Sequence, residues 1–493
     1  MNNKAIMLIL DGYGDAEKSK FNAVTNARTP FLHNLKKLSY SLIKTDGEAV
    51  GLFPGAMGGS EVGHTTIGAG RVVLSTAKKI HDEIKSKKFF ENPKYKKTKN
   101  FLNKNNGDLH IVGLMSDNNI HSNLNHAIEI IKDISKDVKH IYVHFITDGR
   151  DSGVHDSQKY LKYFKNKLKD IKNYEFASIM GRFYAMDREK NLDRTSKAVE
   201  TMFLSQGKKD DSIDKYLKEQ IKLDISDEFI SPVALKTKEK VELNKNDVVF
   251  FFNFREDRLR QICAETEKLK AKIVTMSDVS TVNSTVLYPA KEVKNTLSEY
   301  LSKQGKRQIK IAETTKYAHV TYFLNGGREE PFENEDRVLI ESLKVENFAK
   351  TPKMRAGEIT KQTIKAIKKD YDAIIVNYSN PDMIGHTGDY NAVLKALECL
   401  DKCVRKVVNS AQKNGYNILI TADHGNAEEM KNADGSISTS HSLNRVIAVA
   451  IADEELNMKM FGELKDIAPT FLDLMGLKNN SHFEGKSLLE NKQ

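Results

Sequence analysis

Short apolar runs that stop at polar residues recur along the chain, and this pattern predicts buried strands. Toward the two ends of the sequence the runs are residues 5–10, 42–45, 309–312, 373–376, 418–420 and 446–452. Helical spacing separates several of them, with a short helix predicted at residues 30–38 and a long amphipathic one at residues 391–411. The apolar stripe of the long helix consists of Val393, Leu397, Leu400, Val404 and Val407. Strands that alternate with helices favour an α/β fold.

The middle of the chain repeats this alternation by itself. It has apolar runs at residues 110–115, 141–146, 176–180, 248–252 and 273–276, and helical patterns at 125–134 and 158–168. An α/β segment of this length is expected to fold as a domain. We therefore predict a discontinuous first domain, residues 1–75 and 291–493, and an inserted second α/β domain, residues 76–290. The joins are expected near Ser75 and Ala290.

Composition adds little to this picture. The chain has 493 residues, 39% hydrophobic and 29% charged, which is typical of a soluble globular protein. No run approaches the roughly 18 apolar residues of a membrane span, and the first apolar stretch stops at Asp11 with no cleavage site after it. Of the three cysteines, Cys399 and Cys403 are four apart on the predicted long helix and are expected to be core residues. We expect a reduced, cytoplasmic enzyme.

The net charge points to an anionic partner. Lys and Arg exceed Asp and Glu by 77 to 67, giving +10, and such an excess suits either nucleic acid or a small anionic substrate. The densest basic stretch is KSKKFFENPKYKKTKN, residues 85–100, which interleaves lysines with Phe89, Phe90 and Tyr95. No nucleic-acid recognition motif accompanies it, so a lysine-rich solvated face is the preferred interpretation, with no nucleic-acid partner.

Aspartate and histidine residues gather at the ends of strands predicted for the first domain. They are Asp11, Asp382, His386, Asp423, His424 and His441. In open α/β sheets, ligands bind beyond the carboxyl ends of strands, and carboxylates together with imidazoles suit divalent first-row metals. An isolated Asp-His-Gly is more often a turn that caps a helix. Residues that converge from separate strands instead favour a site for two metal ions.

The candidate nucleophile is Ser60, in the glycine-rich segment GAMGGSEVGHTTIGAG, residues 55–70. Glycines permit a tight turn and close approach of the backbone to a ligand. A serine at a helix start lies among backbone N–H groups that favour an anion, and metal coordination can convert its hydroxyl into a nucleophile. The alternative is that Ser60 serves only as a helix N-cap.

The strand ends of the predicted insert carry a different set of residues. They are Asp117, His121, Arg150, Asp151, Arg182, Arg188, Arg255 and Arg258. Guanidinium groups bind carboxylates and phosphates through two hydrogen bonds, so the set suits a small polyanion. Taken one by one, each arginine would more often be a surface ion-pair partner.

Eight short motifs of this sequence, taken together, resemble those of a known family. LDGYG, GGSEVGH, TDGRD, GRFYAMDR, NFREDR, KYAHVTYFLNGG, DMIGHTG and TADHGN run from Asp11 to His441 in the order found in cofactor-independent phosphoglycerate mutases. That family belongs with the alkaline-phosphatase-like metalloenzymes. The resemblance implies that Asp382, His386 and His441 hold one metal ion. It assigns to the other metal ion Asp11, Ser60, Asp423 and His424.

The same resemblance implies a reaction. It is the glycolytic interconversion of 3-phosphoglycerate and 2-phosphoglycerate through a phosphoserine at Ser60, without 2,3-bisphosphoglycerate. The two metals would be Mn²⁺ in the first instance, with Co²⁺, Mg²⁺ or Zn²⁺ as alternatives, and the enzyme would be a monomer. Asp151 would transfer protons and Lys316 would reach the transferring phosphate. The substrate would be held by His121, Arg150, Asp151, Arg182, Arg188, Arg255 and Arg258.

Some positions depart from the family pattern. Gly59 stands where asparagine is usual, Asn118-Asn119 where glycines are usual, and Ser440 and Ser442 flank His441 where alanine and threonine are usual. A tryptophan expected near Leu192 is missing, since the chain has none. No ligand or arginine is lost, so only loop geometry is in question. A phosphatase, sulfatase or phosphopentomutase on the same core, and a nucleic-acid binder without catalytic activity, are the alternative functions.

Overall fold

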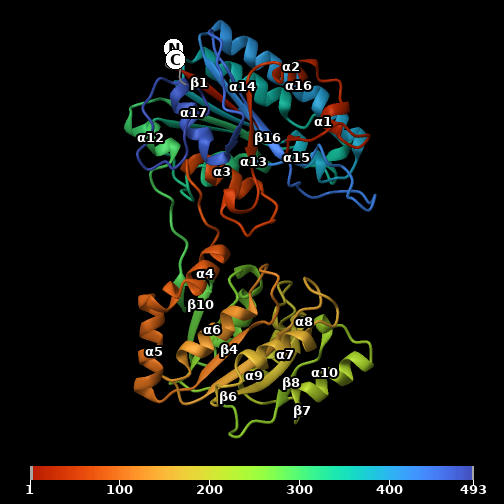
Figure 1. The fold of residues 1–493 in the computed structure, drawn as a ribbon, viewed down its shortest axis with the longest axis vertical. Coiled ribbons are helices and arrows are strands. Elements are labelled where there is room, and N and C mark those ends of the chain that lie inside the picture. The colour runs from red at the N-terminus through yellow and green to blue at the C-terminus, as the bar shows by residue number, and fades with distance from the viewer. Residues whose placement is uncertain (1–3, 491–493) are drawn as a thin grey trace. The chain divides into compact units, whose positions relative to one another are not determined.

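The computed structural model describes residues 4–490, which form two compact units. Among these residues, the first unit consists of residues 4–75 and 291–490, and the second is continuous, residues 76–290. Each contains its own sheet with helices packed on it (Figure 1), so the predicted α/β class is confirmed. Within the described residues, no helix is long and apolar enough to cross a membrane.

The sheet of the first unit has nine strands and a parallel centre. The parallel strands, in spatial order, are β13 (Glu335–Ile340), β12 (Gln308–Glu313), β14 (Ala373–Tyr378), β1 (Ala5–Leu10) and β15 (Asn417–Thr421). Beyond β15 follow β16 (Arg445–Ile451), β3 (Tyr40–Lys44) and β17 (Phe461–Glu463), and β2 (Gly14–Asp15) pairs with β16. β16 is antiparallel to both of its main neighbours, β15 and β3.

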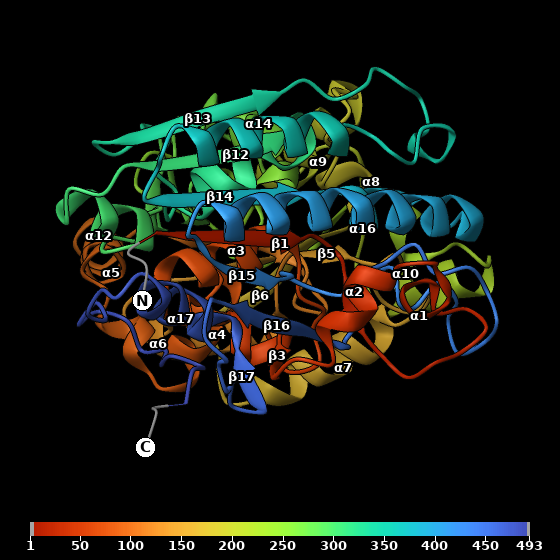
Figure 2. The same cartoon turned by 90° about the horizontal axis from the view of Figure 1, so that it is seen from above.

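Helices cover both faces of this sheet, so every residue of β1 and β14 is buried. α14 (Ala356–Lys368) and α16 (Tyr390–Lys413) lie side by side, packed on β14 and β15 (Figure 2). α17 (Ile467–Leu474) packs on β1 and β15. The other helices are α1 (Ala23–Asn26), α2 (Pro30–Leu35), α3 (Ser60–Ala69), α12 (Leu297–Lys303), α13 (Thr314–Ala318) and α15 (Asn380–Gly385).

Three sequence predictions for this unit have clear outcomes. The stripe from Val393 to Val407 on α16 is fully buried, as predicted. Cys403 lies in the same core and Cys399 packs against it. The helix predicted to reach residue 38 ends instead at Leu35, because Leu38 is exposed and the chain turns to enter β3.

The second unit has an eight-stranded sheet. Its spatial order is β11 (Thr285–Tyr288), β10 (Lys272–Ser277), β9 (Val248–Phe251), β4 (Leu109–Leu114), β5 (Ile141–Thr147), β6 (Tyr174–Gly181), β8 (Val233–Leu235) and β7 (Lys208–Asp210). The six strands from β11 to β6 are parallel, and β8 is antiparallel to β6. The helices are α4 (Thr76–Lys85), α5 (Pro93–Asn105), α6 (Leu124–Ile134), α7 (Ser157–Lys167), α8 (Arg182–Ala185), α9 (Leu192–Phe203), α10 (Ile213–Lys222) and α11 (Arg260–Glu267).

Apolar clusters line both faces of this second sheet. Neighbouring strand residues alternate between them: Ile111 belongs to one cluster and Val112 to the other, as expected when successive side chains point to opposite faces. The basic stretch at residues 85–100 contributes Phe89 and Tyr95 to the first cluster, both fully buried. Those two rings therefore support the core and are not available for stacking on bases.

Candidate active site

Four neighbouring strands of the first unit bring charged side chains to one edge of its sheet. Lys316 follows β12, Asp382 follows β14, Asp11 follows β1, and Asp423 follows β15. Because the strands are parallel, their carboxyl ends share that edge. His441 reaches the same edge because it precedes the antiparallel strand β16.

The turn after β1 brings Asp11 next to Asp382. Gly12 has a φ of +76°, and a Cβ atom there would lie 2.7 Å from the Asp382 Cα. The Asp382 N–H donates to the Asp11 carbonyl oxygen at 3.0 Å. The glycine of the LDGYG motif is thus required both by its backbone conformation and by the closeness of the neighbouring turn.

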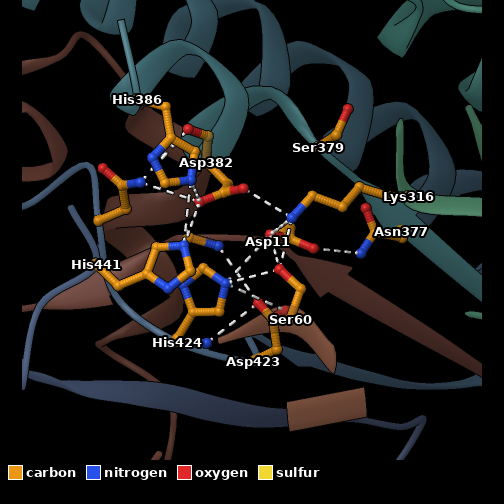
Figure 3. Close-up of polar contacts among 12 residues, drawn as sticks. Asp11, Ser60, Lys316, Asn377, Ser379, Asp382, His386, Asp423, His424 and His441 are labelled. Carbon is orange, nitrogen blue, oxygen red and sulfur yellow. Dashed lines mark hydrogen bonds and ion pairs between the residues drawn. The ribbon is translucent and has the colours of Figure 1, made fainter. Parts of the chain in front are cut away.

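Ser60 lies where these groups converge (Figure 3). α3 begins at Ser60, and its N-cap is Gly59. The Ser60 Oγ is 3.2 Å from Asp11 Oδ1, 2.9 Å from His424 Nε2 and 2.5 Å from Lys316 Nζ. The hydroxyl therefore faces the acidic and imidazole groups, and the interpretation of Ser60 as a helix cap alone does not hold.

A second group forms around Asp382. Its Oδ1 is 3.1 Å from His386 Nε2 and 3.2 Å from His441 Nε2. The other ring nitrogens are taken by backbone: His386 Nδ1 donates to the Thr439 carbonyl at 2.7 Å and His441 Nδ1 to the Gly58 carbonyl at 2.8 Å. Such backbone partners fix a ring so that its second nitrogen can bind a metal.

The electrostatics of the site fit bound cations. Asp11 and Asp423 are fully buried and Asp382 is nearly so, while Lys316 brings one positive charge to the three carboxylates. Burial and the nearby Asp423 raise the pKa of Asp11. Contact with Asp382 raises the pKa of His386. Buried charges of one sign are costly unless they are paired or bind metal.

Two further observations match divalent metal. The Oδ2 of Asp423 is buried and lies 3.2 Å from His64 Nδ1 and 3.5 Å from His424 Nε2, without a well-aligned hydrogen bond from the described residues. Two groups of three residues hold ligand atoms within 4.8 Å of one another: Asp382, His424 and His441, and Asp11, Asp423 and His424. Carboxylate oxygens with imidazole nitrogens are ligands that Mn²⁺, Co²⁺ and Zn²⁺ accept. The residues present therefore fit the expected metals.

Two amides that the sequence patterns did not single out orient these carboxylates. Asn377 Nδ2 donates to Asp11 Oδ2 at 2.8 Å, and Asn426 Nδ2 donates to Asp382 Oδ1 at 3.0 Å. Both residues adjoin recognised motifs, Asn377 in the strand before DMIGHTG and Asn426 at the end of TADHGN. Their position next to the motifs was the only signal in the sequence for these two residues. An asparagine by itself does not indicate that its side chain will contact a carboxylate.

The second unit gathers its arginines at the carboxyl edge of its own sheet. A cavity of about 400 Å³ there is lined by Arg150, Arg182, Arg188 and Arg258, and also by Arg194, which the sequence analysis missed. Burial and the positive charges of Arg182, Arg188 and Arg150 lower the pKa of Arg258. The arginines converge on this one cavity, and their positive potential suits a polyanion.

The remaining residues predicted for this site lie beside the cavity. Arg182 Nη1 donates to Asp148 Oδ1 at 2.7 Å and to Asp151 Oδ2 at 2.5 Å. The Nε2 of His121 is 3.6 Å from Asp151 Oδ2, and burial, with Arg182, lowers the pKa of His121 to about 4. Arg255 is not among the residues that line the cavity, and its guanidinium pairs with Asp257 at 3.1 Å.

The fold and the buried acid-histidine group define a metal-dependent α/β enzyme. A family model described as the Metalloenzyme superfamily matches residues 3–479. The chain is 41% identical to a 2,3-bisphosphoglycerate-independent phosphoglycerate mutase of Clostridium botulinum, covering 98% of this chain and 99% of that one. It is 38% identical to a protein of the same name from Parabacteroides distasonis, covering 99% and 100%.

A solved structure agrees with these relatives. Phosphoglycerate mutase of Leishmania mexicana, determined at low cobalt concentration, superposes with a TM-score of 0.67 at 27% identity and covers 100% of this chain and 98% of that one. The chain belongs to the family of 2,3-bisphosphoglycerate-independent phosphoglycerate mutases.

Proposed function

We propose that this chain interconverts 3-phosphoglycerate and 2-phosphoglycerate by way of a phosphoserine at Ser60, without 2,3-bisphosphoglycerate. The observation that carries the proposal is the convergence of Asp11, His424 and Lys316 on the Ser60 hydroxyl. Membership of the mutase family supports the reaction. The arginine-lined cavity supports a phosphorylated, carboxylate-bearing substrate.

The first unit supplies the nucleophile. Ser60 opens α3, where backbone N–H groups without helical partners favour an anion. Lys316 Nζ is within hydrogen-bond distance of both Ser60 and Asp11, so it can stabilise negative charge on the transferring phosphoryl group. Two divalent ions, with Mn²⁺ the first choice, would be held by Asp382, His386 and His441 and by Asp11, Ser60, Asp423 and His424. When bound they would lower the pKa of the hydroxyl and offset phosphate charge.

The second unit supplies the substrate site and the proton transfer. Arg150, Arg182, Arg188 and Arg258 would bind the phosphate and carboxylate groups, and Arg255 would join them by leaving Asp257. Asp151 would move protons to and from the glycerate oxygens, held in place by Arg182. His121, neutral near pH 7 because its pKa is about 4, would donate a hydrogen bond to substrate without adding charge. The enzyme is proposed to act as a cytoplasmic monomer.

The test is the Ser60→Ala variant. It should lose essentially all isomerisation, by at least about a thousandfold, because the hydroxyl that Asp11, His424 and Lys316 contact would be gone. Isomer formation and inorganic phosphate release should both be measured, since a phosphatase would give phosphate only. The matched control is Ser379→Ala, because the Ser379 hydroxyl donates to Glu313 at 2.7 Å and does not contact Ser60; it should keep most of the activity. Comparable isomerisation by Ser60→Ala would refute the proposal.

A further inference from the structure

Ser60, Lys316 and Asp382 line one cavity of the first unit. A separate cavity in the same unit shares no lining residue with it. It has a volume of about 670 Å³ and lies between the loop at residues 350–354 and one face of α16. That volume is within the range of about 300–1,000 Å³ typical of small-molecule sites. Neither the metal ligands nor the arginines contribute to it, so the proposed mutase chemistry leaves it unexplained.

Lysines surround the opening of this cavity. Two come from the loop, Lys350 and Lys353, and three from α16, Lys395, Lys402 and Lys406. In the described part of the chain none of the five makes an ion pair. Glu398 is the one acidic residue among those that line the cavity. Five ammonium groups around one carboxylate create a strongly positive rim that favours a ligand with several negative charges.

The floor of the cavity is mostly apolar. Leu343, Pro352 and Met354 line it together with the two cysteines of α16. An apolar floor beneath a cationic rim fits an amphipathic ligand better than a bare inorganic anion, which would gain nothing from the floor.

One polar atom in the wall also lacks a partner. The Thr351 Oγ1 is buried and makes no hydrogen bond within the residues that the structure describes. Such a group is costly unless a ligand or water satisfies it. A ligand with hydrogen-bonding edges on a flat body would fit the apolar floor, and rotation of the Thr351 side chain would bring this hydroxyl to it.

We propose that this cavity binds a nucleoside polyphosphate, with the base on the apolar floor and the phosphates at the five lysines. A fatty acid would satisfy the floor but carries a single charge. Inorganic polyphosphate would satisfy the rim but not the floor. A nucleoside triphosphate satisfies both, and the lysines can each donate to phosphate oxygens.

The wall of the cavity is linked to the helix that carries Asp382. Asn380, the first residue of α15, donates through Nδ2 to the Pro352 carbonyl at 2.9 Å. A ligand that orders the loop at residues 350–354 should therefore also protect the start of α15. Protection from hydrogen exchange in these two segments, and on the cavity face of α16, would locate the ligand without any measurement of activity.

The experiment is calorimetric titration of the protein with ATP, with Mg²⁺ in excess so that the nucleotide does not remove divalent ions from the protein. Inorganic triphosphate and adenosine serve as the charge-only and base-only probes. ATP should bind with one site in this cavity. The double variant Lys402→Ala/Lys406→Ala should bind ATP at least about tenfold more weakly. The control Lys368→Ala/Lys413→Ala removes the same charge from exposed positions outside the cavity and should bind normally.

Several results would overturn the proposal. ATP could fail to bind, or bind the Lys402→Ala/Lys406→Ala variant as tightly as the wild type. Loss of binding in Arg188→Ala would place the nucleotide in the arginine cavity of the second unit. If inorganic triphosphate binds as tightly as ATP, the lysines attract phosphate groups and the cavity does not recognise the adenine base. Exchange protection confined to the second unit would contradict the assignment independently.

Discussion

Lys316 shows how a single side chain takes its properties from its surroundings. Its Nζ is 2.7 Å from Asp11 Oδ1 and 2.7 Å from Asp382 Oδ2. Burial alone would lower the pKa of this amine, but the charges of Asp11 and Asp382 outweigh burial and raise it. The two carboxylates thus favour the ammonium form, which can donate hydrogen bonds and offset negative charge.

Replacing Lys316 with methionine tests this role. Removing one donor that stabilises developing charge costs about 3–4 kcal/mol, so kcat should fall by about a hundredfold to a thousandfold. KM should change little, because the arginines of the second unit are proposed to hold the substrate. Lys361→Met, at an exposed position on α14, is the control. A kcat within about threefold of wild type would show that Lys316 is not needed for phosphoryl transfer.

At the residue scale, the sequence indicates the candidate metal ligands better than the residues that hydrogen-bond to those ligands. Asp423 and His424 could be placed because an apolar run ends just before them. Asn377 could not, since its contact with Asp11 joins residues 366 positions apart and an asparagine in a strand has no distinctive pattern. Arg255 shows a different limit: the motif places it with the other arginines, but no pattern indicates that Asp257, two residues on, pairs with it.

At the scale of elements, Glu428 joins loops that hold the site together. Its carboxylate accepts from the N–H groups of Gly14 at 3.0 Å and Asn426 at 2.8 Å, and from the Ser442 hydroxyl. Gly14 follows the Asp11 turn, Asn426 follows His424, and Ser442 follows His441. One buried carboxylate thus fixes three ligand-bearing segments.

We expect Glu428→Ala to lower the free energy of unfolding by about 3–5 kcal/mol, because several buried donors lose a charged acceptor. It should also weaken metal binding, measured by titration with Mn²⁺. Glu429→Ala is the matched control: Glu429 is exposed and accepts from the Asn444 amide at 3.0 Å, so its loss should cost less than about 1 kcal/mol. Equal effects of the two substitutions would contradict the role given to Glu428.

Strands differed in how well the sequence predicted them. β1 and β14 were found because both faces are covered, which demands apolar residues at every position. β7, with the sequence KKD, and β13, with EDRVLI, were missed. Both lie at sheet edges, where pairing with one neighbour and exposure to solvent permit charged residues. Their pairing depends on tertiary contacts that no local pattern records.

A pair of histidines in the second sheet should make this unit sensitive to acid. His110 on β4 and His144 on β5 are buried and stacked, with His110 Nδ1 3.0 Å from His144 Nε2. Burial lowers the pKa of His110 from 6.5 to about 3, and burial and His110 lower that of His144 well below 6.5. Below pH 6.5 these histidines bind more protons in the unfolded chain than in the folded one. The free energy of unfolding is therefore highest above pH 6.5 and falls as the pH drops toward 3.

The expected slope is about 1.4 kcal/mol per pH unit for each histidine. It can be measured as the pH dependence of hydrogen exchange in β4 and β5. The double variant His110→Phe/His144→Phe should show a flatter dependence between pH 6 and pH 4, whatever its absolute stability. A slope unchanged by the double substitution would mean that other groups control the acid response.

At the scale of the whole molecule, each unit holds part of the proposed chemistry. The first has the serine, its acid-histidine group and Lys316, and a site of this kind alone would suit a phosphatase. The second has the arginine cavity with Asp151 and His121 beside it. The mutase activity is proposed to need both, since the glycerate must be held while the phosphoryl group is on Ser60.

The most direct measurement is therefore to trap the phosphorylated enzyme. The protein would be mixed with 3-phosphoglycerate labelled in its phosphoryl group, quenched in acid within a single turnover, and digested for mass spectrometry of its peptides. We expect label on Ser60, appearing before labelled 2-phosphoglycerate and disappearing as that product forms. Label on another residue, or 2-phosphoglycerate formed while no label is found on the protein, would contradict it.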